Sequence, residues 1–210
     1  MIFYYLYTMI TNIIICITVL VSIISMENHT LKNKLLFNPY MIHHRKEWYR
    51  FFSGAFIHAD WMHLVFNMYS LYMFGGVVER EYAYLFEGKG VLFFILLYGL
   101  GILMSTFYSF EKHKNDIFYN ALGASGAVSA VVFAYIILFP TQKLLFLFLP
   151  FPIPAYLFGA VFLGVEYYLG KRGNSNIGHD AHFWGAVHGV VFTIILKPNL
   201  IISFIEQIRQ

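Results

Sequence analysis

The chain has 210 residues, of which 59% are hydrophobic and only 12% are charged. Soluble globular domains carry roughly 25% charged residues, so this composition excludes an ordinary soluble fold and indicates a polytopic membrane protein. The net charge of +3 is spread over the connecting segments, and no basic cluster with interleaved aromatic residues predicts a nucleic-acid partner. With Cys16 as its one cysteine, the chain can form no internal disulfide and no cysteine metal site.

Six apolar segments are long enough to predict membrane helices, since a bilayer-spanning helix needs about 20 largely apolar residues. The predicted spans are 3–25, 61–79, 90–109, 121–139, 144–168 and 181–197. We expect an all-α polytopic membrane protein with a single domain over residues 1–210. The first segment is interpreted as a helix rather than a cleaved signal, because it lacks a basic start and a cleavage motif.

Two segments outside the regular helices have unusual compositions. The first connection, about 26–60, is rich in Trp and Phe, which predicts a loop in the interfacial belt of the membrane. Pro150, Pro152 and Pro154 interrupt the fifth span, because proline lacks a backbone donor and clashes with the preceding turn. We therefore expect a loop that enters the membrane, followed by a helix from about Ala155.

Ser125 lies between Gly123 and Gly126 at the start of the fourth span. Polar side chains at membrane depth are costly and indicate function. The first backbone N–H groups of a helix are unpaired and lie at its positive dipole end, where they can stabilise an oxyanion. Ser125 is therefore a candidate nucleophile, and Gly123 and Gly126 are predicted to let a substrate backbone approach closely.

The last span carries a candidate base for this serine. Gly185 and Gly189 form a Gly-x-x-x-Gly face suited to close helix packing, and His182 lies three residues before Gly185. Packing of this face on the fourth span would bring His182 towards Ser125. An imidazole titrates near neutral pH and suits a general base. His188 falls on another part of the helix and is interpreted as structural.

His63 and Asn67 open the second span and share one helix face, since they are four residues apart. Both side chains can donate hydrogen bonds, which an oxyanion hole requires. Glu79 and Arg80 are interpreted as a structural ion pair at a helix end. Glu166 ends the fifth span and is expected at the membrane interface.

Three motifs in this order carry a family resemblance: His63-x-x-x-Asn67, Gly123-x-Ser125-Gly126 and Ala181-His182-x-x-Gly185-x-x-x-Gly189. With them, the chain resembles the rhomboid intramembrane serine proteases. The resemblance implies a minimal six-helix bundle with a half-embedded first loop. It implies a Ser–His dyad with Ser125 as nucleophile and His182 as general base, and an oxyanion hole made by His63, Asn67 and the Ser125 N–H. It also implies transmembrane protein substrates in membrane lipid, no cofactor, and the fifth helix as a lateral gate.

The resemblance further implies a cytoplasmic N-terminus, with the active site opening to the extracytoplasmic side of a bacterial inner membrane. The loop charges favour the opposite orientation. Nine Lys and Arg residues would lie outside against five inside, the reverse of the positive-inside tendency. We adopt the orientation that the family implies.

Some features depart from the family or leave alternatives open. Ser129 stands where many rhomboids have an aromatic residue packed on the histidine, and Tyr49 separates Trp48 from Arg50 in the first-loop motif. A metal site at His179 and His182 is not expected, because the H-E-x-x-H pattern is absent. The alternatives are a catalytically inactive rhomboid-like adaptor and a small-solute transporter. The transporter would predict inverted repeats and midplane charges, and the sequence has neither.

Overall fold

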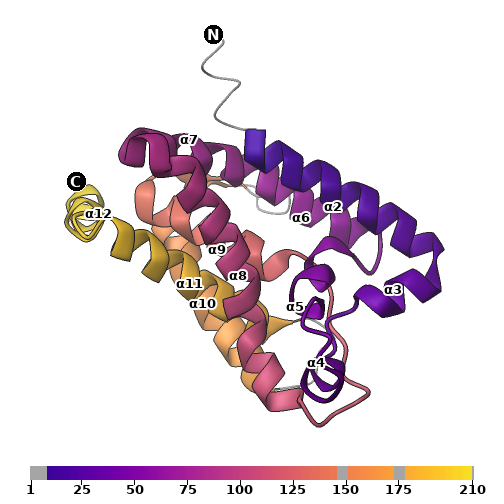
Figure 1. Cartoon of the computed structure of the whole chain (residues 1–210). Helices are drawn as coiled ribbons and strands as arrows, with labels where there is room; N and C mark the ends of the chain where they lie inside the picture. Colours follow the sequence, from indigo (N-terminus) through magenta and orange to yellow (C-terminus); the bar gives the residue numbers. More distant parts are fainter. Residues whose placement is uncertain (1–8, 146–150, 173–177, 210) are drawn as a thin grey trace.

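The structure is a computed structural model that describes residues 9–145, 151–172 and 178–209, and these residues are mostly helical (Figure 1). Pro150 and the predicted residues 3–8 of the first span lie outside the described residues. The first described element is α2 (Met9–Glu27), which lies along one edge of the molecule. The first connection holds α3 (His29–Leu35), α4 (Pro39–Arg45), α5 (Arg50–Ser53) and the 3₁₀-helix η1 (Gly54–Phe56).

The remaining elements form two stretches. The first contains α6 (Trp61–Ser70), the π-helix η2 (Leu71–Gly75), α7 (Gly76–Phe86), the 3₁₀-helix η3 (Glu87–Lys89) and α8 (Gly90–His113). The second contains α9 (Ser125–Leu138), the two-residue strands β1 (Lys143–Leu144) and β2 (Ile153–Pro154), α10 (Ala155–Arg172), α11 (His179–Leu196) and α12 (Leu200–Arg209). β1 and β2 pair antiparallel, with Lys143 opposite Pro154. α10 begins at Ala155, as predicted from the prolines.

Within the described residues, two helical runs are long and apolar enough to cross a membrane, Met9–Glu27 and Trp61–His113. α11 and α12 together would make a third such run, although they are bent by 110° at their junction. α9 is only 14 residues long. Most of its residues are buried among the other helices, so it need not match the thickness of a bilayer. The protein is a helical membrane protein, and the count of six spans stays a prediction.

The centre of the molecule is formed by α8, α9 and α11, which all pack on one another. A Cβ at Gly185 would overlap the backbone carbonyl of Gly126, and a Cβ at Gly189 would overlap that of Ala130. The backbones of α9 and α11 are therefore in direct contact, which fixes the start of one helix against the start of the other. Tyr82 of α7 joins the far end of this pair, because its hydroxyl lies 2.6 Å from Thr193 Oγ1.

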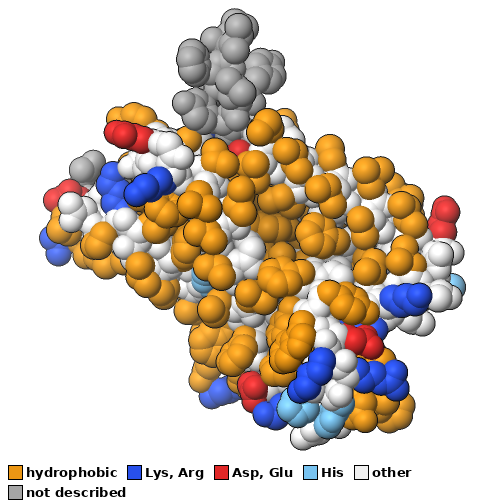
Figure 2. Space-filling view, in the orientation of Figure 1, with side chains coloured by type: hydrophobic (Ala, Val, Ile, Leu, Met, Phe, Trp, Pro, Cys, Tyr) orange, Lys and Arg blue, Asp and Glu red, His pale blue; other side chains and the backbone are white. Residues whose placement is uncertain are grey.

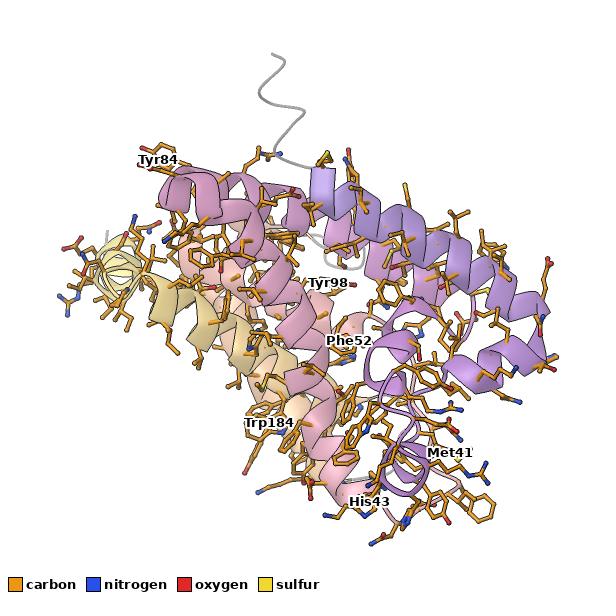
Figure 3. The ribbon with its side chains drawn as sticks, in the orientation of Figure 1. Met41, His43, Phe52, Tyr84, Tyr98 and Trp184 are labelled. Atoms are coloured by element: carbon orange, nitrogen blue, oxygen red, sulfur yellow. The ribbon has the colours of Figure 1, made fainter. Side chains whose placement is uncertain are left out.

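The surface has the polarity expected of a membrane protein. Hydrophobic side chains cover most of the visible face, while charged side chains gather at its periphery (Figure 2). Tyr84 and Trp184 project outward from α7 and α11 towards different ends of the bundle (Figure 3). Amphipathic aromatic side chains are favoured at membrane interfaces, so these two residues are consistent with interfacial positions.

Glu79 does not lie at a helix end as predicted, because α7 continues to Phe86. Instead its carboxylate is fully buried and binds the first turn of α2. One oxygen accepts from the Ile10 N–H at 2.9 Å. The other accepts from the Thr11 N–H at 2.9 Å and from the Thr11 hydroxyl at 2.7 Å. The N-terminal N–H groups of a helix are unpaired and electropositive, so this carboxylate satisfies them and attaches α2 to α7.

Replacing Glu79 by glutamine is expected to lower the free energy of unfolding by about 2–3 kcal/mol, since hydrogen bonds to a buried charged group are worth about that much. The amide N–H₂ of glutamine would also face a backbone N–H of Ile10 or Thr11, and two donors cannot form a hydrogen bond. Glu87, an exposed residue after α7, provides the control, and Glu87→Gln should unfold like the parent. Unfolding in detergent micelles measures the difference, and equal stability of both variants would contradict the assignment.

Candidate active site

Ser125 and His182 meet where α9 and α11 begin. Ser125 is the first residue of α9, and His182 lies in the first turn of α11. Ser125 Oγ is 2.8 Å from His182 Nε2, a hydrogen-bond distance. The hydroxyl can therefore donate its proton to the imidazole, the contact that activates a serine nucleophile.

The segment that precedes Ser125 is held by the first connection. Phe37 and Ala121 exchange two backbone hydrogen bonds, of 3.0 and 2.9 Å, and the Gly123 N–H donates to the Gly54 carbonyl at 2.9 Å. Gly123 has φ +112°, in the region that favours glycine, and a Cβ there would lie 2.6 Å from the His63 ring. The turn into Ser125 is thus fixed from outside its own helix.

His63 and Asn67 lie on α6 and face the same cavity as Ser125 and His182, a space of about 1250 Å³. The Asp60 carboxylate caps α6 by accepting from the His63 N–H at 2.8 Å. Asn67 Nδ2 donates to the His63 carbonyl at 2.8 Å, which orients the amide. The structure therefore brings all four predicted residues to one cavity, at the positive end of α9.

Glu166 of α10 contacts His182 from the side opposite the serine. One carboxylate oxygen lies 3.1 Å from His182 Nδ1, and the other lies 2.6 Å from His179 Nδ1. Only 9% of Glu166 is exposed. Glu166 does not end the fifth helix as predicted, because α10 continues to Arg172 and buries this side chain inside the bundle.

The same three side chains could hold a metal ion. One ligand atom each from Glu166, His179 and His182 lies within 4.8 Å of the others. Histidine nitrogen and carboxylate oxygen are ordinary zinc ligands. In this structure the same three side chains are paired with one another by hydrogen bonds.

Comparison with known proteins identifies the family. A family model described as the Rhomboid domain matches residues 45–199. This chain belongs to the rhomboid family. The resemblance predicted from its motifs is confirmed.

Three relatives share this rhomboid sequence over much of its length. The chain is 32% identical over 149 residues to "RHOMBOID-like protein 12, mitochondrial" of Arabidopsis thaliana, and 27% identical over 199 residues to "Rhomboid-like protein 11, chloroplastic" of the same plant. It is 25% identical over 158 residues to the rhomboid protein YdcA of Bacillus subtilis (strain 168). These matches cover 64%, 89% and 71% of the chain.

The matches cover 42% and 66% of the lengths of the two plant relatives, and 67% of the bacterial one. The plant relatives are named mitochondrial and chloroplastic. The predicted location in a bacterial inner membrane is therefore not supported, and what stands is a membrane protein with apolar helices.

In this rhomboid the space left by the glycines near Ser125 is filled by other side chains of the protein. The site of a Cβ at Gly123 is taken by His63, and at Gly126 by the Ser105 side chain of α8. Both glycines line the cavity, but their missing side chains do not leave the open space that we predicted for a substrate backbone. The reason is the close packing of α6 and α8 on the start of α9, which spacing in the sequence does not reveal.

His182 also has an aromatic neighbour, although Ser129 replaces the ring expected on α9. The ring centroid of Phe162, one turn before Glu166 on α10, lies 6.4 Å from that of His182. The aromatic neighbour that the family often takes from α9 is thus supplied here by α10. His188, interpreted as structural, lies 3.3 Å from the Leu97 carbonyl through Nε2.

His58 is a fully buried residue of the site that was not predicted from the sequence. The Ser22 hydroxyl donates to the Phe56 carbonyl at 3.0 Å, so it accepts from His58 Nδ1 at 2.9 Å. That leaves the lone pair of His58 Nε2 to accept the Ala124 N–H at 3.4 Å. The neutral ring therefore links α2 to the residue before Ser125. The signal in the sequence was a lone polar residue after the apolar triplet Ala55–Ile57.

Acid should destabilise the protein through His58, because burial, with a smaller effect of His63, lowers the pKa of this imidazole to about 4. The unfolded chain titrates near 6.5, so the contribution of His58 to stability is full above pH 6.5 and lost as pH falls to 4. At about 1.4 kcal/mol per pKa unit, the loss is about 3 kcal/mol. Unfolding measured across this range should show a shallower decline for His58→Gln than for the parent; equal slopes would contradict the prediction.

Proposed function

We propose that this rhomboid is an intramembrane serine endopeptidase that cleaves transmembrane protein substrates, with residues 1–210 acting as one peptidase domain. The observation that carries the proposal is the 2.8 Å contact between Ser125 Oγ and His182 Nε2. This contact lies at the N-terminus of a buried helix and opens into a cavity of about 1250 Å³. Nucleophile, base and room for a peptide are the parts that acyl transfer requires.

In the proposed reaction, Ser125 Oγ attacks the substrate carbonyl carbon while His182 Nε2 takes the hydroxyl proton. The tetrahedral intermediate collapses when its C–N bond breaks, and the imidazolium returns the proton to the leaving amine. An acyl-enzyme remains on Ser125. Water then attacks this ester with His182 as base, which releases the carboxylic acid and restores the serine.

The oxyanion of the tetrahedral intermediate would be stabilised by donors from two helices. The Ser125 N–H belongs to the unpaired first turn of α9. His63 and Asn67 add side-chain donors from α6, and both line the cavity. Removing one such donor costs a typical hydrolase about 10²–10³-fold in kcat.

The wider architecture is proposed from the family: six membrane spans, a half-embedded first loop, a cytoplasmic N-terminus and α10 as a lateral gate. Two features of the fold support parts of it. The first connection packs on the segment before Ser125, and α10 buries only Ala155, Gly159 and Glu166. Tags at both termini test the orientation, since accessibility of the N-terminal tag from the outer face would contradict it.

A fluorophosphonate probe tests the catalytic proposal without a known substrate, because it forms a covalent bond only with an activated serine. We expect labelling of the parent in detergent and its loss in Ser125→Ala, with the modified peptide containing Ser125. A reporter transmembrane protein should be cleaved by the parent alone. An unlabelled parent that is nevertheless folded would contradict the protease and favour the inactive adaptor.

A further inference from the structure

The acidic partner of His182 has no counterpart in a Ser–His dyad. Glu166 and Ser125 contact opposite nitrogens of the same imidazole, at 3.1 and 2.8 Å. The three side chains come from three helices, α10, α11 and α9, so the alignment is made by the tertiary fold. Ser, His and a carboxylate in this order form the chain of hydrogen bonds that activates many serine hydrolases.

We infer that Glu166 is a positioning residue that completes a Ser125–His182–Glu166 triad in this rhomboid. The inference rests on the proposed protease function and deepens it. An ionised carboxylate only accepts hydrogen bonds, so His182 must donate from Nδ1. The lone pair of Nε2 then faces the Ser125 hydroxyl, which is the tautomer that a general base needs.

His179 holds the carboxylate in place. Its Nδ1 lies 2.6 Å from one oxygen of Glu166 while His182 contacts the other. A buried carboxylate is costly unless its oxygens are paired, and here both oxygens have partners. The carboxylate can therefore remain ionised beside His182 and stabilise the imidazolium that forms when the serine proton is taken.

Few titratable side chains surround His182, so stabilisation of its imidazolium can be assigned to one of them. Glu166 faces it from α10, His179 lies on its own helix, and His63 faces it from α6. The side chain of α9 that touches it is the neutral Ser125. Asp180, the acidic residue of α11, pairs instead with Lys112, whose Nζ lies 3.5 Å from Asp180 Oδ2. Glu166 is thus the anion in contact with the imidazole among the described residues.

The test compares Glu166→Gln, Glu166→Asp and Asp180→Asn with the parent, using cleavage of a reporter transmembrane substrate. Glutamine can donate as well as accept, so it no longer fixes the tautomer. We expect E166Q to lower kcat by about 10²–10⁴-fold with KM changed less than threefold, in line with the loss when a triad carboxylate becomes an amide. E166D should recover at least a tenth of the lost kcat, and the control D180N should match the parent.

The split between kcat and KM, together with rescue by E166D, supplies a readout that a purely structural role would not move. A folded E166Q with the kcat of the parent overturns the inference. If E166Q fails to fold, His179→Leu takes its place, and it must lower kcat at least tenfold with KM unchanged.

Two further experiments distinguish the triad from a failure of the proposed function and from a metal site. If Ser125→Ala retains activity, the proposed function fails; if only E166Q retains it, the dyad stands and the triad fails. Treatment of the parent with EDTA should leave cleavage unchanged. Loss of activity with EDTA and its return with Zn²⁺ would show that the cluster of Glu166, His179 and His182 binds metal, which overturns the triad.

Discussion

His182→Ala is expected to lower kcat/KM for a transmembrane substrate by at least about 10³-fold, because Ser125 then has no base within hydrogen-bond reach. The substitution removes the imidazole whose Nε2 lies 2.8 Å from the serine oxygen. The helix itself should survive, since Gly185 and Gly189 make the backbone contacts with α9. The measurement is steady-state cleavage of a reporter substrate, with unfolding in detergent as the check on stability.

A histidine on the same helix provides the matched control. His188 lies 3.3 Å from the Leu97 carbonyl, away from Ser125, so His188→Gln should retain kcat within about threefold. The double variant Ser125→Ala/His182→Ala should be no slower than Ser125→Ala alone, because members of one catalytic unit are strongly non-additive. Activity in His182→Ala close to that of the parent would contradict the assigned base.

The sequence was most informative where a polar residue interrupted an apolar helix. Ser125, His182 and Asn67 could be selected because such residues are costly inside a membrane, and all three line one cavity. The faces of small residues on α9 and α11 could also be predicted, since Gly-x-x-x-Gly spacing permits close backbone contact.

The positions of Glu166 and His58 could not be predicted from the sequence. Glu166 was placed at the end of a span because hydropathy averages over a window, while α10 runs six residues beyond Glu166 to Arg172. Its hydrogen bonds with His179 and His182 depend on how α10 packs on α11. His58 lies outside any helix, in a connection that folds back on the segment before Ser125.

The predicted helix boundaries were wrong where tertiary contacts, rather than local composition, determine the backbone conformation. The predicted fourth span of 121–139 begins in irregular chain, because residues 121–124 are held by Phe37, Gly54 and His58 rather than by helical hydrogen bonds. α12 was missed altogether. Its apolar residues Ile201, Ile205 and Ile208 recur at helical spacing beside Glu206 and Arg209, and it bends 110° from α11.

Gly185→Ala is expected to lower the proposed protease activity from a position that bears no reactive group. A Cβ at Gly185 would overlap the carbonyl oxygen of Gly126, the residue after Ser125. Backbone cannot rotate away as a side chain can, so α9 and α11 must separate. Overpacking of this kind costs typically about 1–3 kcal/mol of stability. A shift of about 1 Å between nucleophile and base can cost about 10²-fold in rate, so kcat should fall by that order while the protein remains folded.

Gly164→Ala provides the comparison for Gly185→Ala, because a Cβ at Gly164 of α10 would meet nothing within 4 Å. Alanine stabilises an exposed helix by up to about 1 kcal/mol relative to glycine, so this variant should unfold no earlier than the parent and cleave at the parental rate. Unfolding and fluorophosphonate labelling of both variants are measured side by side. If Gly185→Ala labels as fast as Gly164→Ala, the direct contact of α9 with α11 does not set the distance between Ser125 and His182.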